Sequence, residues 1–75
     1  MKVLIVDDEL LMIKSLKYSL EQDNYEVEFT ADSNEALRKI SITEYDIVIL
    51  DLILPESDGL EVCQKIREIS SVPIL

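Results

Sequence analysis

Two short apolar segments, each ending at aspartate, limit the folds open to this chain of 75 residues. Residues 3–6 (Val-Leu-Ile-Val) precede Asp7 and Asp8, and residues 47–50 (Ile-Val-Ile-Leu) precede Asp51. Continuous β-branched, apolar runs of this length are typical of parallel strands that are buried on both faces. The carboxyl ends of parallel strands lie at one edge of the sheet, where ligand sites form. With a strand order of 2-1-3-4, the three aspartates are expected to meet there.

The segments between these runs predict an alternation of strands and helices. Residues 25–30 alternate apolar and acidic side chains, which indicates an edge strand with one solvated face. Residues 32–35 have the composition of a helix start. Apolar residues at helical spacing follow each strand and are expected to face inward: Leu10, Ile13, Leu16 or Lys17, and Leu20; then Ala36, Leu37 and Ile40; then Val62, Ile66 and Ile69. This order predicts an α/β sandwich around a parallel sheet with right-handed crossovers.

The chain stops inside its last apolar run, residues 72–75. A buried strand is normally followed by a turn and a helix, so we expect residues 1–75 to form a C-terminally incomplete domain, truncated after the start of its fourth strand. Exposed sheet edges pair with other chains. Self-association through the edge of the fourth strand is therefore a further expectation.

The composition narrows the possible functions. Sixteen acidic residues face seven basic ones, for a net charge of −9, which opposes nucleic acids and anionic membranes as direct partners. No apolar run exceeds four residues, whereas a membrane span needs about 20, so we expect a soluble, cytoplasmic protein. A single Cys excludes an internal disulfide, and a single Gly excludes the glycine-rich loops of nucleotide-binding sites.

The candidate site consists of Asp7, Asp8 and Asp51. Two carboxylates about 4 Å apart repel by roughly 4 kcal/mol at an effective dielectric of 20, so three in one cleft require protonation or a bound cation. An all-oxygen set without His or Cys favours Mg²⁺ over zinc. The first and third helices are expected to begin at the same place, and helix starts favour a bound anion. A site that binds both a cation and an anion suggests phosphate. In the simpler interpretation, these acids only end strands and cap helices. That interpretation explains a single Asp well, but it explains poorly why three acids directly follow apolar strands.

At these positions the chain resembles the receiver domain of bacterial two-component response regulators. The matching segments are residues 3–9 (VLIVDDE), 47–55 (IVILDLILP), 58–62 (DGLEV) and 72–75 (VPIL). The resemblance spans the whole chain. It implies a flavodoxin-like (CheY-like) three-layer α/β/α sandwich with sheet order 2-1-3-4-5, of which this sequence holds strands 2-1-3-4.

The resemblance also implies roles for individual residues. Asp51 is implied to be the phosphoacceptor, which receives a phosphoryl group from the His of a sensor histidine kinase. Asp8 is implied to be the main Mg²⁺ carboxylate, with Asp7 assisting directly or through water, and Asp51 and the backbone carbonyl of Ile53 complete the protein ligands. A carboxylate nucleophile needs no general base, so the absence of His is no obstacle. The implied function is a signalling module, not an enzyme, forming the regulatory part of a transcriptional regulator.

Two alternatives remain beside this interpretation. The family continues past the fourth strand with a Ser or Thr that contacts the phosphoryl group, and later with a Lys, and the sequence contains neither segment. A fragment with a disabled switch, acting only as an interaction or folding unit without phosphotransfer, is therefore the second hypothesis. The third hypothesis is a Mg²⁺-dependent phosphohydrolase with an Asp nucleophile. Such an enzyme would have its nucleophile and second acid two residues apart after the first strand, whereas Asp7 and Asp8 are adjacent, so this hypothesis is less favoured.

Several neighbouring residues have structural interpretations. Pro55 and Gly59 are expected to shape the loop before the third helix. Glu9 is either a first-turn helix acid or an outer-shell partner of the metal. Cys63 is predicted to be a half-buried packing thiol. Packing with a solvated hydroxyl is predicted for Tyr18, Tyr25 and Tyr45.

Overall fold

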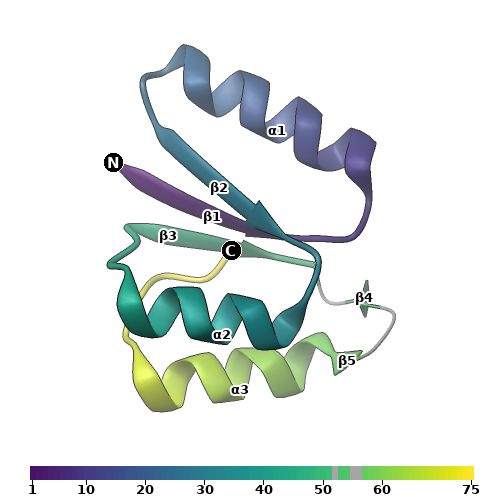
Figure 1. Ribbon diagram of the computed structural model, residues 1–75, viewed down its shortest axis with the longest axis vertical. Coiled ribbons are helices and arrows are strands. Elements are labelled where there is room, and N and C mark those ends of the chain that lie inside the picture. The colour runs from purple at the N-terminus through teal and green to yellow at the C-terminus, as the bar shows by residue number, and fades with distance from the viewer. Residues whose placement is uncertain (52, 55–56) are drawn as a thin grey trace.

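The computed structural model describes residues 1–51, 53–54 and 57–75, and shows a parallel sheet with helices on both faces. One helix covers the first face and two helices lie side by side on the other (Figure 1). This arrangement confirms the predicted α/β sandwich. Within the described residues, no helix is long and apolar enough to cross a membrane. The helices are α1 (Leu10–Gln22), α2 (Ser33–Ile42) and α3 (Gly59–Ile69).

The central sheet has the predicted strand order. It consists of β1 (Lys2–Val6), β2 (Glu26–Thr30) and β3 (Ile47–Leu50), arranged as β2-β1-β3 with every pair parallel. Ile74 forms an isolated parallel bridge to Val48 of β3, so the last segment of the chain lies beside β3, where the sequence predicted its fourth strand.

The pairing of this last segment is shorter than a strand. Val48 donates its N–H to the Pro73 carbonyl, and Leu75 donates to the Val48 carbonyl, both at 2.9 Å. Proline has no N–H to donate, which limits the ladder at Pro73. Self-association through the outer edge of this segment stays a prediction.

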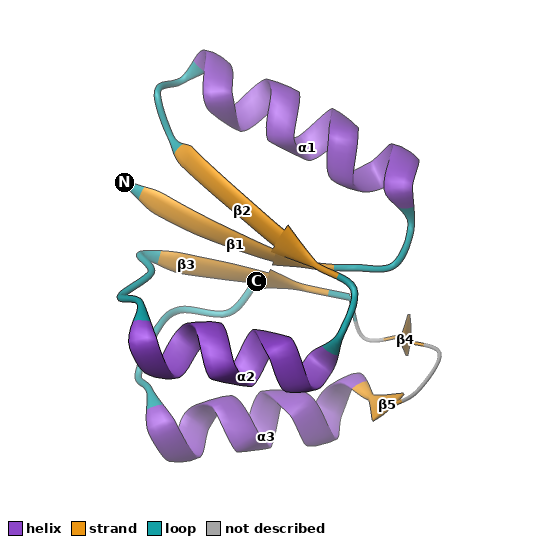
Figure 2. Cartoon of the chain, in the orientation of Figure 1, coloured by secondary structure: helices purple, strands orange, loops and turns teal. Residues whose placement is uncertain are grey.

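A short antiparallel pair stands where the sequence predicted a loop. β4 (Ile53–Leu54) pairs with β5 (Ser57–Asp58), and α3 begins directly afterwards (Figure 2). Pairing supplies partners for backbone groups that have left the central sheet. The predicted role of Pro55 lies outside the described residues. Gly59 is the first residue of α3 and does not have a positive φ, so no turn there demands glycine.

Successive residues of β1 divide the core in two. Val3 and Ile5 pack with Ile13 of α1, whereas Leu4 and Val6 pack with α2 and α3. These four apolar residues of β1 are fully buried, as expected for the middle strand of a sheet that is covered on both faces. The half-buried Cys63 packs against the second cluster, which confirms its interpretation as a packing thiol.

Three side chains that were predicted to pack inward are exposed. Leu10 is 56% exposed, and its neighbours Leu11 and Met12 are also exposed. The first turn of α1 begins beyond the carboxyl end of β1 (Figure 1), so the sheet does not lie beneath it. Ile69, the last residue of α3, and Tyr18 are exposed as well. Helical spacing predicts a face correctly only where the opposing layer extends along the whole helix.

The prediction of a solvated hydroxyl is wrong for Tyr45. Its side chain is buried, and the hydroxyl donates a hydrogen bond of 2.6 Å to Oε1 of Glu28. Nζ of Lys39 lies 3.5 Å from the same oxygen. Burial and this hydrogen bond raise the pKa of Tyr45, while the hydrogen bond and Lys39 lower the pKa of Glu28. Glu28 is therefore half-buried and paired, although the sequence placed it on a solvated face.

Replacing Tyr45 with phenylalanine is expected to lower the free energy of unfolding by about 1 kcal/mol, because a hydrogen bond to a carboxylate is lost while Glu28 remains partly hydrated. The folded pKa of Glu28 is lowered, so its contribution is present at neutral pH and is lost in acid, below about pH 4. Urea denaturation of the wild type and Y45F at pH 7 and pH 3 measures both effects. Tyr18→Phe, at an exposed site, is the matched control, and an equal loss in that variant would contradict the expectation.

Candidate functional site

Three carboxylates converge at the carboxyl end of the central sheet. Asp7 and Asp8 directly follow β1, and Asp51 directly follows β3. One carboxylate oxygen from each lies within 4.8 Å of the other two. Asp7 and Asp51 are half-buried, whereas Asp8 is exposed. The structure thus brings together the three aspartates that the strand order placed at one edge.

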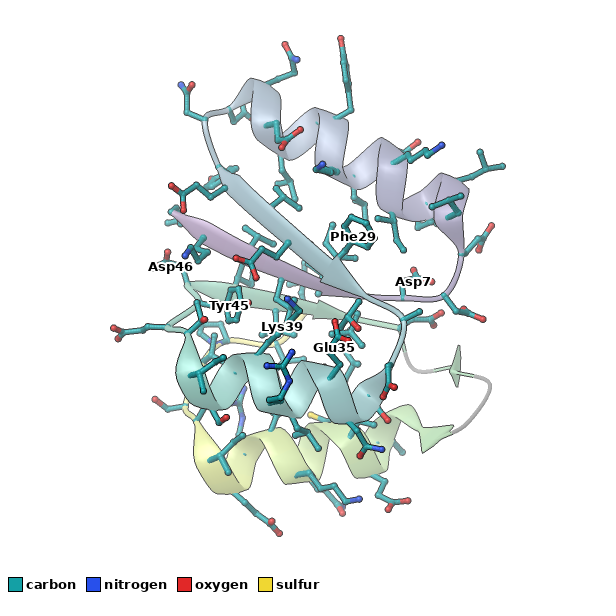
Figure 3. The ribbon with its side chains drawn as sticks, viewed as in Figure 1. Asp7, Phe29, Glu35, Lys39, Tyr45 and Asp46 are labelled. Atoms are coloured by element: carbon teal, nitrogen blue, oxygen red, sulfur yellow. The ribbon has the colours of Figure 1, made fainter. Side chains whose placement is uncertain are left out.

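Backbone hydrogen bonds hold the ends of these strands in place. Asp51 donates its N–H to the Val6 carbonyl at 2.9 Å, and Asp7 donates to the Thr30 carbonyl at 3.1 Å. Oδ1 of Asp7 accepts a hydrogen bond of 2.9 Å from the N–H of Glu9 (Figure 3 shows Asp7 between β1 and α1). Both the backbone and the carboxylate of Asp7 are therefore oriented before any ligand binds.

Glu9 occupies the N-cap position of α1 instead of its first turn. Its side chain makes no capping hydrogen bond, and the first turn of α1 contains no acidic residue. The interpretation of Glu9 as a first-turn acid is therefore wrong. Its role as an outer-shell partner of the metal stays a prediction.

The donor set fits a magnesium ion. Magnesium binds oxygen at about 2.1 Å in an octahedron, so opposite ligands are about 4.2 Å apart. One carboxylate oxygen from each of Asp7, Asp8 and Asp51 lies within 4.8 Å of the other two, a limit close to the width of such an octahedron. Ile53 opens β4 two positions beyond Asp51, and its backbone carbonyl as a fourth ligand stays a prediction.

Helix starts surround the same edge of the sheet. α1 and α3 both begin at the end where β1 and β3 finish (Figure 1). The first turns of helices carry unpaired N–H groups and a partial positive charge, which favour an anion. The arrangement can therefore accept a cation on the carboxylates and an anion beside it.

Thr30 is a residue of this region that sequence reasoning missed. It ends β2, is buried, and shares hydrogen bonds with both Asp7 and Asp32. A lone Thr inside an alternating strand carries no motif. The only signal was its position two residues before Asp32, a helix N-cap, because a hydroxyl at that spacing commonly binds the backbone of such turns.

Comparison with known proteins identifies the family. The family model for the response regulator receiver domain matches residues 3–75. The chain belongs to the response regulator receiver domain family. It is 40% identical over 74 residues to the transcriptional regulatory protein ResD of Bacillus subtilis, covering 99% of this chain and 31% of ResD. It is 42% identical over 67 residues to PhoP of the same organism, the alkaline phosphatase synthesis transcriptional regulatory protein, covering 89% of this chain and 28% of PhoP. The chain thus spans about a third of the length of these relatives.

Solved structures confirm the fold. A two-component response regulator from Clostridium difficile superposes with a TM-score of 0.93 at 34% identity, over 97% of this chain and 60% of that one. The response regulator TrrA, solved in complex with the histidine kinase ThkA, gives a TM-score of 0.89 at 38% identity, over 97% of this chain and 64% of the matched chain. TrrA from Thermotoga maritima has also been solved with Mg²⁺ and BeF. These neighbours establish the CheY-like receiver architecture.

Proposed function

We propose that this chain accepts a phosphoryl group on Asp51, with Mg²⁺ held by Asp7, Asp8, Asp51 and the carbonyl of Ile53. The observation that carries the proposal is the convergence of three carboxylates, within 4.8 Å, from the ends of two adjacent strands. The structure of TrrA with Mg²⁺ and BeF supports the choice of metal. It also supports a bound phosphoryl-like group at such a site.

The reaction needs only a positioned carboxylate and charge neutralisation. An oxygen of Asp51 attacks the phosphorus of a phosphohistidine in line with the P–N bond. That bond breaks, its electron pair goes to the ring nitrogen, and a ring already protonated on its other nitrogen leaves as neutral imidazole. The product is an acyl phosphate on Asp51. When bound, Mg²⁺ supplies charge neutralisation for the phosphoryl oxygens.

The donor in this proposal is a sensor histidine kinase. A relative in the same family, TrrA, forms a complex with the histidine kinase ThkA. On this chain, the exposed apolar side chains of Leu10, Leu11 and Met12 begin two residues after Asp8, so they offer a contact surface beside the acceptor. We place the activity in the cytoplasm and, by likeness to ResD and PhoP, in transcriptional regulation.

A small phosphodonor tests the proposal without the kinase. The wild-type chain is incubated with acetyl phosphate and Mg²⁺, and intact mass spectrometry follows the addition of one phosphoryl group. We expect labelling that disappears when EDTA removes the metal, because the three carboxylates otherwise repel the anionic donor. A chain that is folded by circular dichroism but gains no phosphoryl group would instead support the alternative of an interaction unit without phosphotransfer.

A further inference from the structure

Thr30 is a buried polar residue, with 5% of its surface exposed. Its hydroxyl both accepts and donates a hydrogen bond with the backbone of Asp32, two residues later. Oγ1 accepts a hydrogen bond of 3.1 Å from the Asp32 N–H, and it lies 3.4 Å from the Asp32 carbonyl, to which it donates. A buried hydroxyl with both of these partners fixes the path of the chain as it leaves β2.

The backbone of Thr30 extends this network to the acidic site. Its carbonyl accepts the N–H of Asp7 at 3.1 Å. In the other direction, Oδ1 of Asp32 accepts the N–H groups of Asn34 and Glu35 at 2.8 and 3.3 Å, which caps α2. Thr30 therefore connects the start of α2 with the backbone of a carboxylate in the candidate metal centre.

We propose that Thr30 is a positioning residue for this centre: its hydroxyl fixes the turn between β2 and α2, and the carbonyl so held sets the position of Asp7. The inference rests on the proposed function, because it assigns Asp7 to a Mg²⁺ site. Thr30 itself is not a ligand. Its effect reaches the site only through the backbone of Asp7.

The requirement for the hydroxyl follows from the burial of Thr30 itself, because Oγ1 and the backbone of Asp32 are each other's hydrogen-bond partners. Valine has almost the same shape as threonine but leaves the Asp32 N–H without its acceptor, and the turn must shift to hydrate that group. The Thr30 carbonyl moves with it, and the N–H of Asp7 loses a fixed partner. Because Mg²⁺ demands near-ideal octahedral geometry, a small displacement of one carboxylate weakens binding.

The test compares Thr30→Val with Thr30→Ser and with the matched control Thr43→Val. Thr43 is the half-buried C-cap residue of α2, at the opposite end of that helix from Asp32. Isothermal titration calorimetry measures the Mg²⁺ dissociation constant, and NMR hydrogen exchange measures protection of the Asp7 amide in metal-free protein. We expect T30V to weaken Mg²⁺ binding about ten-fold and to speed exchange at Asp7. T30S is expected to restore both, and T43V is expected to change neither.

Each outcome bears on a different claim. If the wild type binds no Mg²⁺, the proposed function fails, and exchange at Asp7 alone then decides whether Thr30 positions that residue. If the wild type binds Mg²⁺ and T30V binds it equally well, or T43V weakens it by the same factor, the inference about Thr30 is overturned and the proposed function stands. Should T30V fail to fold, the wild type still decides: an Asp7 amide that exchanges much faster than the β1 amides overturns the inference.

Discussion

Replacing Asp51 with asparagine is expected to lower phosphorylation by acetyl phosphate about 1000-fold or more, to the background of the assay. The neutral amide lacks the charged oxygen that forms the acyl phosphate, and loss of a covalent nucleophile has effects of this size or larger. Intact mass spectrometry of wild type and D51N, at matched Mg²⁺ and donor concentrations, measures the difference. Labelling of D51N at the wild-type rate would show that the phosphoryl group resides elsewhere.

The same substitution is expected to stabilise the metal-free chain. It removes one of three like charges within 4.8 Å, whose repulsion is roughly 1 kcal/mol per pair at this separation in a water-like medium. Urea denaturation in EDTA measures the gain. Asp23→Asn is the matched control because Asp23 is an exposed C-cap residue of α1, at the far end of that helix from the site. A loss of both phosphorylation and stability in D51N would indicate misfolding and would leave the role of Asp51 unsupported.

Much of this site could be predicted because its determinants are local. The apolar runs that end at Asp7 and Asp51 identify buried parallel strands, and parallel strands place their carboxyl ends at one edge. Asp32 was recognised as a helix start for the same reason, since an N-cap depends on residues two and three positions later. The convergence of the aspartates also depends on the strand order, which is not local and which the resemblance to the receiver family implied.

The features that sequence reasoning missed depend on contacts between distant segments. Tyr45 and Glu28 are 17 positions apart, and neither carries a local signal for their hydrogen bond. The exposure of Leu10 depends on where the sheet ends beneath α1, which helical spacing does not encode. Thr30 contacts Asp7 only because β1 and β2 are neighbours. Such pairs become visible only once the register of the strands is known.

Replacing Asp8 with asparagine is expected to weaken Mg²⁺ binding by about ten-fold to a hundred-fold and, without metal, to raise the midpoint of thermal unfolding. Both effects have one cause, because the charge that attracts the cation repels the neighbouring carboxylates when the cation is absent. Calorimetric titration with Mg²⁺ and thermal unfolding with and without EDTA measure the two effects.

Glu9→Gln separates this local effect from the general acidity of the chain. It removes the same unit of charge at the next position, on an exposed N-cap residue whose side chain makes no capping hydrogen bond. If the three-aspartate cluster binds the metal, E9Q is expected to change Mg²⁺ affinity less than about two-fold, an effect of screened surface charge alone. An E9Q effect as large as that of D8N would place Glu9 in the outer shell. An unchanged affinity in D8N would show that Asp8 does not bind the metal, and the proposed centre of three aspartates would then fail.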